Sequence, residues 1–243
     1  MRLDQAIPQR YPELSRRKAR ELVSSGRVFV NDRPVRVASR EVSERDRITI
    51  GAAPPDLDLI GETQDWVAVN KPPGIATQPM REREQRSLEE WMRVRFGTIY
   101  LVHRVDTQTS GVVVFAKTRA AAAELSSLFA TRAIRKLYLA VVEGHLSREL
   151  QIESPIGGKD AHTIVRPLRT LEGMTLVEAE ILTGRTHQIR IHMKSVEQPV
   201  VGDRRYGSTM PAPRMLLHAW KLEHAYFGGE LVAPVPADFP ARV

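Results

Sequence analysis

One polar segment of the sequence holds a carboxylate in a position suited to chemistry. In HRVDTQTSGVVVFAK, residues 103–117, Asp106 lies in a polar stretch directly before an apolar run. Arg104 comes two residues earlier, and Gly111 permits a tight turn that can hold the loop rigid. A lone carboxylate fixed beside an arginine can stay ionised and act as a nucleophile or a general base. The residues alone leave a second interpretation equally open, in which Asp106 only ties the turn to its own amides.

Several familiar kinds of catalytic site have no support in the sequence. It contains no GxGxxG or GxxxxGK[ST] loop for nucleotide phosphates, no HExxH zinc motif and no GxSxG nucleophile turn. It contains no cysteine, which excludes disulfides, thiolate metal sites and thiol catalysis. The seven histidines are scattered, and the five-residue spacing of His187 and His192 sets them about 140° apart on a helix. We therefore expect no metal site.

The elements that would position Asp106 mix strands and helices without a strict βαβ rhythm. Hydrophobic patterns predict an α+β fold rather than a doubly wound sheet. In the strand 136–143, alternate residues would face opposite sides of the sheet, with Tyr138 on one side and Leu139 on the other. The other predicted elements are strands at 65–71, 112–115, 162–169 and 174–182, and helices from Ser87, over 119–130 and from Thr186.

Most of the excess positive charge lies in the first fifty residues. The formal net charge of the chain is +7, and residues 1–50 hold 12 basic and seven acidic side chains. Ser15 can cap a helix over 16–25 that Gly26 ends, and alternating valines from Val28 to Val37 predict a hairpin before a last strand near 48–50. A concentrated basic surface favours a polyanion, since each neutralised phosphate releases a counterion. Residues 1–50 are therefore expected to form a compact domain that binds RNA or DNA.

The segment GAAPPDLDL, residues 51–59, has the small residues and paired prolines of a linker, which leaves 60–243 as a second, larger domain. No run of about 18 apolar residues predicts a membrane span. The first twenty residues lack the apolar core of a secretory signal. We expect a monomeric, cytoplasmic protein without a membrane partner.

The N-terminal segment, residues 2–50, resembles the RNA-binding domain named after ribosomal protein S-four. In that family the second helix and the hairpin face the RNA. The resemblance implies five RNA-binding residues in this chain, Arg16, Arg17, Arg20, Arg27 and Asn31.

Residues 103–117 resemble the signature HRLDxxTSGLLLxAK of the RluA family of RNA pseudouridine synthases. The likeness continues in order along the chain, in VNKPPGIATQP (69–79), RKLYLAVVEG (135–144), TGRTHQIRIHM (183–193), PVVGDRRYG (199–207) and LLHAWKLEH (216–224). It implies a catalytic domain with a mixed, mainly antiparallel sheet flanked by helices and loops. It also implies site-specific isomerisation of uridine to pseudouridine in structured RNA.

The family resemblance implies a role for individual residues. Asp106 would be the essential aspartate, Tyr138 would stack on the base and help to remove the proton from carbon 5, and Arg190 would keep Asp106 ionised and oriented. Arg104 would fill the space of the extruded nucleotide or hold phosphate. Three further residues would bind substrate, His103, Arg185 and Thr109. From the residues alone, a place in the core is the commoner fate of a tyrosine such as Tyr138. The two helix arginines could be solvated charges, and His103 could be a structural imidazole.

The implied reaction breaks the bond from nitrogen 1 to the sugar and bonds carbon 5 instead. Because it is an isomerisation, it needs no redox cofactor, metal or activated donor, and we expect no cofactor. Whether Asp106 attacks the sugar, attacks the base or abstracts a ribose proton stays open. The resemblance and the appended RNA-binding domain favour large-subunit ribosomal RNA over transfer RNA.

Two alternatives rank below this enzyme. One is a noncatalytic RNA-binding or ribosome-assembly module, which the loss of Asp106 or Tyr138 would favour, although both are present. The other is a glycosidase that cleaves a nucleoside bond. That reaction normally uses a second positioned carboxylate, and none accompanies Asp106 in its motif.

Overall fold

The computed structural model describes residues 1–31, 33–51, 57–79 and 87–239, of which residues 33 and 34 are described by backbone alone, and it forms two compact units. One unit comprises Met1–Leu57 and Glu89–Thr98, and the other comprises Asp58–Leu88 and Ile99–Val243. Most of the expected linker falls on residues 52–56, which lie outside the described residues. Its last two residues begin strand β4 (Asp58–Glu62).

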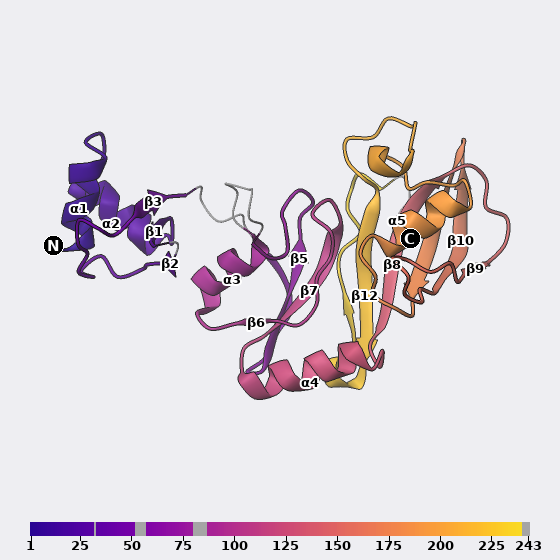
Figure 1. Ribbon diagram of the computed structural model, residues 1–243, viewed down its shortest axis with the longest axis horizontal. Coiled ribbons are helices and arrows are strands. Elements are labelled where there is room, and N and C mark those ends of the chain that lie inside the picture. The colour runs from indigo at the N-terminus through magenta and orange to yellow at the C-terminus, as the bar shows by residue number, and fades with distance from the viewer. Residues whose placement is uncertain (32, 52–56, 80–86, 240–243) are drawn as a thin grey trace. The chain divides into compact units, whose positions relative to one another are not determined.

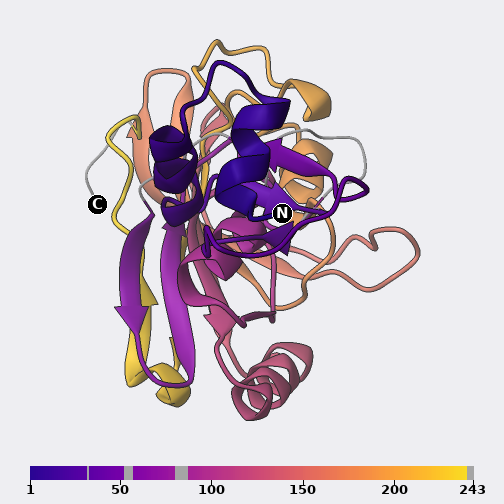
Figure 2. The same ribbon diagram turned by 90° about the vertical axis from the view of Figure 1, so that its left-hand side faces the viewer.

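The N-terminal unit packs two helices, α1 (Leu3–Arg10) and α2 (Arg16–Ser24), side by side (Figure 2). The predicted capping of α2 is confirmed. The Ser15 hydroxyl accepts a hydrogen bond from the Lys18 amide, and Gly26 follows the helix with a φ of 71°. Leu3, Ile7 and Leu22 are buried in the core of this unit, so α2 presents its basic side chains outward.

The small sheet of this unit has three antiparallel strands with β1 in the middle, β1 (Val28–Val30), β2 (Arg33–Pro34) and β3 (Ile48–Ile50). The expected alternation through Val37 is wrong, since β2 ends at Pro34 and Val37 is 60 % exposed. Proline lacks the amide proton that a strand ladder needs. The predicted turn at Asn31-Asp32 lies partly outside the described residues, because Asp32 is not among them. Helix α3 (Leu88–Phe96) contributes Trp91, whose ring meets Phe29 edge-on at 6.5 Å.

The larger unit is built on a ten-stranded sheet of order β4-β5-β7-β12-β8-β11-β10-β9 (Figure 1). Strand β13 pairs with β12 and β6 pairs with β7. The strands after β4 are β5 (Trp66–Lys71), β6 (Tyr100–Leu101), β7 (Ser110–Ala116), β8 (Arg135–Glu143), β9 (Leu150–Ile152), β10 (Thr163–Leu171), β11 (Met174–Ile181), β12 (Leu217–His224) and β13 (Gly229–Val232). The mixed, mainly antiparallel sheet and the α+β class are as expected.

One short parallel seam joins the two sides of this sheet. Strand β12 pairs in parallel with β7 at Ser110 and Gly111, whereas the other strand pairs among the described residues are antiparallel. Gly111 has a φ of 111°, and a Cβ there would collide with the backbone carbonyl of Ala219. A glycine is therefore required where the Asp106 loop enters the sheet.

Strand β8 is buried on both faces, as its alternating residues predict. Ala140 and Val142 belong to one apolar cluster with Val177, and Leu139 and Val141 belong to another. Tyr138 packs against the first cluster.

Helix α5 (Gln188–Ser195) packs on β10 and β11, and its Ile189 and Met193 belong to the cluster that Tyr138 contacts. Helix α5 and Tyr138 thus share one face of the sheet. Helix α4 (Arg119–Ala130) lies at one end of the sheet in both views (Figures 1 and 2). The remaining short helices are η1 (Arg204–Tyr206) and η2 (Ala225–Phe227). No helix in the described part of the chain is both long and apolar enough to cross a membrane.

Candidate active site

The loop that carries Asp106 is braced from two sides. The Thr109 amide donates to the backbone carbonyl of Asp106 at 3.1 Å, and the Gly74 amide donates to the carbonyl of Thr107 at 2.8 Å. The buried Thr77 hydroxyl donates to the carbonyl of Val105 at 2.7 Å. These bonds make the loop a fixed platform, as the turn residues of the motif predict.

A buried lysine adds a third support to this loop. Lys71 is 0 % exposed, and its Nζ donates to the carbonyls of Pro72 at 3.0 Å, Ile75 at 2.9 Å and Thr107 at 3.1 Å. Three carbonyls match the three protons of an ammonium group. Burial lowers the pKa of Lys71 to about 7, and the negative charge of Asp106 opposes this shift.

Arg190 links two carboxylates. Its Nη1 donates to Asp106 Oδ2 at 3.1 Å, while Nε and Nη2 donate to the two carboxylate oxygens of Asp203 at 2.6 and 2.9 Å. Burial works against the charged guanidinium, but the hydrogen bonds and charges of the two aspartates raise the pKa of Arg190. A permanent cation thus lies in direct contact with the Asp106 carboxylate.

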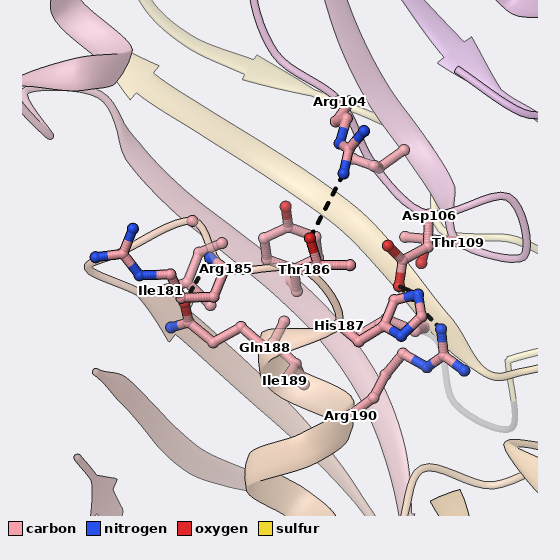
Figure 3. A pocket seen from close by; sticks show the side chains of 14 residues that line it. Arg104, Asp106, Thr109, Ile181, Arg185, Thr186, His187, Gln188, Ile189 and Arg190 are labelled. Carbon is pink, nitrogen blue, oxygen red and sulfur yellow. Dashed lines mark hydrogen bonds and ion pairs between the residues drawn. The ribbon is translucent and has the colours of Figure 1, made fainter. Parts of the chain in front are cut away.

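His187 and Tyr206, together with Arg190, form a series of contacts that begins and ends at the Asp106 carboxylate. The Arg190 guanidinium lies 4.8 Å from the centre of the Tyr206 ring, and the Tyr206 hydroxyl is 2.8 Å from His187 Nδ1. His187 Nε2 lies 3.8 Å from Asp106 Oδ2. Burial lowers the pKa of His187, although Asp106 opposes this, so the imidazole is neutral at pH 7. Figure 3 shows His187 and Arg190 together beside Asp106.

Asp106 lines a cavity of about 140 Å³ (Figure 3). Tyr138 forms part of the wall of the same cavity. A second cavity, of about 420 Å³, also reaches Asp106 and is lined by Thr77, Gln78 and Arg205. Burial and the charge of Asp106 raise the pKa of Tyr138, so its phenol is neutral at pH 7. The predicted trio of Asp106, Tyr138 and Arg190 therefore meets around one small cavity.

Three of the four predicted substrate-binding residues line this same cavity, Arg104, Thr109 and Arg185. Arg104 Nη2 donates to the Thr186 hydroxyl at 3.5 Å, and Arg185 Nε donates to the carbonyl of Asp160 at 2.8 Å. The hydroxyl of Thr109 is buried without a partner in the part of the chain that the structure describes.

His103 does not line the cavity that Tyr138 shares with Asp106. Its Nε2 accepts a hydrogen bond from the Val114 amide at 2.9 Å, and its ring stacks on Phe129 at 4.4 Å. Burial lowers the pKa of His103 to about 3, so the ring is neutral. Here the histidine connects the loop to β7 and to helix α4.

In the N-terminal unit, Arg16 and Arg20 are held by a buried acid. Both donate through Nε to Asp4 Oδ2, at 3.0 and 2.8 Å. Despite the opposing effect of burial, these arginines lower the pKa of Asp4 to about 2. The two arginines line a shallow groove together with Arg17 and Arg36.

The other two residues predicted to bind RNA are engaged within the fold. Arg27 Nε donates to the carbonyl of Gly51 at 3.0 Å. Asn31 has a φ of 51° and donates through Nδ2 to Asp46 Oδ1 at 2.6 Å. Neither lines the groove of Arg16, Arg17 and Arg20.

Sequence reasoning did not identify Asp203, Tyr206 or Lys71 as parts of the site. Asp203 and Tyr206 lie in PVVGDRRYG, and Lys71 lies in VNKPPGIATQP, both of which resemble family motifs. A charged residue inside an otherwise apolar strand, such as Lys71 in β5, is a further signal of a special environment.

Comparisons with known proteins agree with this geometry. Residues 65–195 match the family model described as RNA pseudouridylate synthase, and residues 1–48 match the S4 domain. An uncharacterized RNA pseudouridine synthase of Helicobacter pylori is 31% identical over 93% of this chain and 94% of its own length. Ribosomal large subunit pseudouridine synthase D of Xylella fastidiosa is 32% identical over 98% of this chain and 86% of its own.

A solved structure shows the same fold. Human RNA Pseudouridylate Synthase Domain Containing 1 superposes with a TM-score of 0.61 at 28% identity, covering 70% of this chain and 79% of that chain.

Proposed function

Because this chain belongs to the RluA family of RNA pseudouridine synthases and carries an N-terminal S4 domain, we propose that it isomerises uridine in ribosomal RNA with Asp106 as its catalytic aspartate. One observation carries this assignment. Asp106 opens into a small cavity that Tyr138 lines, and Arg190 holds its carboxylate at 3.1 Å.

The chain's own residues supply what the isomerisation needs. The Asp106 carboxylate acts on the ribose or the base as the bond from nitrogen 1 breaks, and Arg190 holds it in place through a hydrogen bond. The small cavity confines the detached base while it turns to present carbon 5. The ring of Tyr138 stacks on the base. Since its phenol is neutral, the hydroxyl acts as a relay for the carbon 5 proton rather than as a pre-formed base.

We propose that residues 1–50 form a domain that binds RNA outside the cavity and that residues 60–243 form the catalytic domain. Residues 51–59 are the proposed linker between them. The S4 match over 1–48 and the synthase match over 65–195 support this division. The basic groove of Arg16, Arg17 and Arg20 supplies phosphate contacts. Arg27 and Asn31 are proposed as further RNA contacts outside that groove.

Large-subunit ribosomal RNA is the proposed substrate, in preference to transfer RNA. Relatives named ribosomal large subunit pseudouridine synthase D cover almost the whole chain, which supports this choice. The enzyme is proposed to act as a monomer, because Asp106, Tyr138 and Arg190 all come from one chain. A cytoplasmic location is proposed because the absence of cysteine suits a reducing compartment.

Replacing Asp106 by asparagine tests the assignment. Asp106→Asn keeps the size of the side chain but removes its charge, so we expect RNA binding to persist and isomerisation to be lost. The measurement is pseudouridine mapping in total RNA from cells that carry the wild-type gene, the variant gene or no gene. Wild-type levels of every modification with Asp106→Asn would refute the role of Asp106. If the wild type modified no uridine at all, a noncatalytic RNA-binding module would be the better description.

A further inference from the structure

A third cavity adjoins the site and is lined by cations. Its volume is about 480 Å³, and among the described residues its wall holds three arginines and a lysine but no carboxylate, the four being Arg104, Arg132, Lys136 and Arg185. Arg104, Arg185 and Tyr138 line both this cavity and the one that opens onto Asp106. The cation-lined cavity therefore shares part of its wall with the place proposed for the target base.

Lys136 is the most unusual member of this group. It lies on β8 two residues before Tyr138 and is 8 % exposed, yet its amino group has neither a hydrogen bond nor an ion pair among the described residues. Burial and the charge of Arg132 lower its pKa. Lys136 lines the cavity and its amine has no partner among the described residues, so an anion bound in the cavity would be a favourable partner for it.

The preceding residue on the same strand shows the contrast. Arg135 donates to both oxygens of Glu180, at 2.7 and 2.9 Å, and to Glu223 at 2.9 Å. The fold thus supplies two carboxylates to the cation on one side of β8 and none to Lys136 on the other. An anion bound from outside the protein would give Lys136 the negatively charged partner that the fold does not supply.

Arg132 occupies a position where glycine is usual. It follows helix α4 with a φ of 63°, in the left-handed region that side chains other than glycine disfavour. Arg132 lines the same cavity as Lys136. This position allows a test in which the charge is removed without straining the backbone.

We propose that Lys136 and Arg132, with Arg104 and Arg185, bind a backbone phosphate of the RNA next to the nucleotide that enters the Asp106 cavity. The inference rests on the proposed function, because RNA supplies the phosphate and the extruded uridine places it there. A dense set of positive donors around a cavity suits a phosphate, which offers several acceptor oxygens and a full negative charge. Because the two cavities share Arg104, Tyr138 and Arg185, we assign the site to a phosphate that flanks the target nucleotide.

The test is the salt dependence of binding to an unmodified transcript of large-subunit ribosomal RNA. Lys136→Met keeps the apolar stem and removes the amine, and Arg132→Gly removes the guanidinium while relieving the backbone. We expect each to bind less tightly and to flatten the slope of log K against log salt by about 0.7 to 0.9, the value for one phosphate contact. Lys136→Arg should restore the slope.

Arg119→Gln is the matched control. Arg119 begins helix α4, and Arg132 follows the other end of that helix, which is about 18 Å long for twelve residues at 1.5 Å each. Arg119 does not line the cavity. We expect its slope to equal that of the wild type. Should Lys136→Met fail to fold, as circular dichroism would reveal, Arg132→Gly still decides the matter because it does not strain the chain.

Wild-type slopes in both variants would overturn the proposal. A second arm titrates inorganic phosphate into wild type and Lys136→Met by calorimetry. If phosphate bound only the wild type while the RNA slopes were equal, the cavity would be a site for a free anion and the proposal would be wrong. Turnover is measured in parallel, so an active wild type with unchanged slopes refutes this inference alone. An inactive wild type refutes the proposed function.

Discussion

Asp203 accepts two hydrogen bonds from Arg190, at 2.6 Å from Nε and 2.9 Å from Nη2, while Nη1 of the same guanidinium donates to Asp106 at 3.1 Å. Asp203 is nearly fully buried and does not line the Asp106 cavity. We therefore expect it to act through Arg190, as a positioning residue. The bidentate contact fixes the plane of the guanidinium, and that plane sets the direction of the Asp106 carboxylate.

Asp203→Asn should lower kcat by about 10²-fold with little change in the Kd for RNA, because a misplaced Arg190 disturbs the geometry at Asp106 rather than RNA contacts. Single-turnover kinetics and filter binding on the same transcript separate the two quantities. Asp203→Glu should recover part of kcat. The control is Asp238→Asn, since Asp238 forms a similar bidentate pair with Arg214, at 2.6 and 2.8 Å, away from the cavity. Equal kcat values for the two asparagine variants would contradict the positioning role.

Tyr138→Phe keeps the ring and removes only the hydroxyl. If that hydroxyl relays the carbon 5 proton, the rate of isomerisation should fall by about 10²- to 10⁴-fold while RNA binding is retained. Substrate tritiated at carbon 5 measures the release of that proton directly. Tyr100→Phe, on β6 and away from the cavity, should leave the rate unchanged. A fully active Tyr138→Phe would restrict Tyr138 to stacking.

Gly111→Ala should destabilise the protein by about 2 to 3 kcal/mol, because the added Cβ meets the Ala219 backbone in a strand that cannot easily move. Urea denaturation gives the free energy of unfolding. Gly157→Ala is the matched control, since Gly157 has a φ of 58° but no atom within 4 Å of an added Cβ. Its cost should be about 1 kcal/mol, from backbone strain alone. Similar losses in both variants would show that the β7–β12 seam tolerates the methyl group.

The lowered pKa of Glu180 predicts how the free energy of unfolding changes at acidic pH. Hydrogen bonds from Arg135, and then from Arg166, lower its pKa to about 2 from 4.5 despite its burial. Between these values the unfolded chain binds more protons than the folded one, so stability present above pH 4.5 is lost as the pH falls toward 2. Glu180→Gln should therefore cost roughly 2 to 3 kcal/mol at pH 7 and much less near pH 2.

Urea titrations at several pH values measure this convergence. The control is Glu149→Gln, because Glu149 pairs with the same Arg166 at 2.9 Å but is 44% exposed. Exposed pairs contribute little, so its effect should stay below about 1 kcal/mol at every pH. If the difference in the free energy of unfolding between wild type and Glu180→Gln did not shrink in acid, the ion pairs of Glu180 would be excluded as its cause.

The N-terminal groove predicts a second, independent effect on salt dependence. Arg17→Gln and Arg36→Gln together should flatten the slope of log K against log salt by about 1.4 to 1.8 if each contacts one phosphate of RNA. Neither side chain holds Asp4, so the fold of the unit should be preserved. Arg45→Gln, in the same unit but outside the groove, is the control. An unchanged slope would exclude this groove as a phosphate-binding surface.

Local patterns in the sequence predicted much of the fold. Helices α2 and α4 and strands β5, β7 and β8 form where periodicity and caps place them, because short-range backbone preferences decide such elements. Strands β4, β6, β9, β12 and β13 were not predicted as strands. They are short or pair with partners distant in sequence, and such pairing depends on tertiary contacts.

The site shows the same division. Motif resemblance brought Asp106, Tyr138 and Arg190 into consideration, and the structure places them around one cavity. The supports from Asp203 and Lys71 could not be derived from spacing, since each depends on how loops return to the sheet. His103 is the opposite case, a residue that the motif placed near the site. It lies three positions from Asp106 in the sequence, but its ring stacks on Phe129.

The position of β12 has a consequence for the newly made protein. This strand lies between β7 and β8 in the sheet, yet it comes after residue 216 in a chain of 243. Asp106 precedes β7, and Tyr138 lies on β8, so the two sides of the catalytic centre stay unjoined until β12 has left the ribosome. A nascent chain can already expose its basic N-terminal helices to RNA, but it cannot yet modify that RNA. During translation, the RNA-binding helices are thus complete before the residues of the proposed catalytic site can come together.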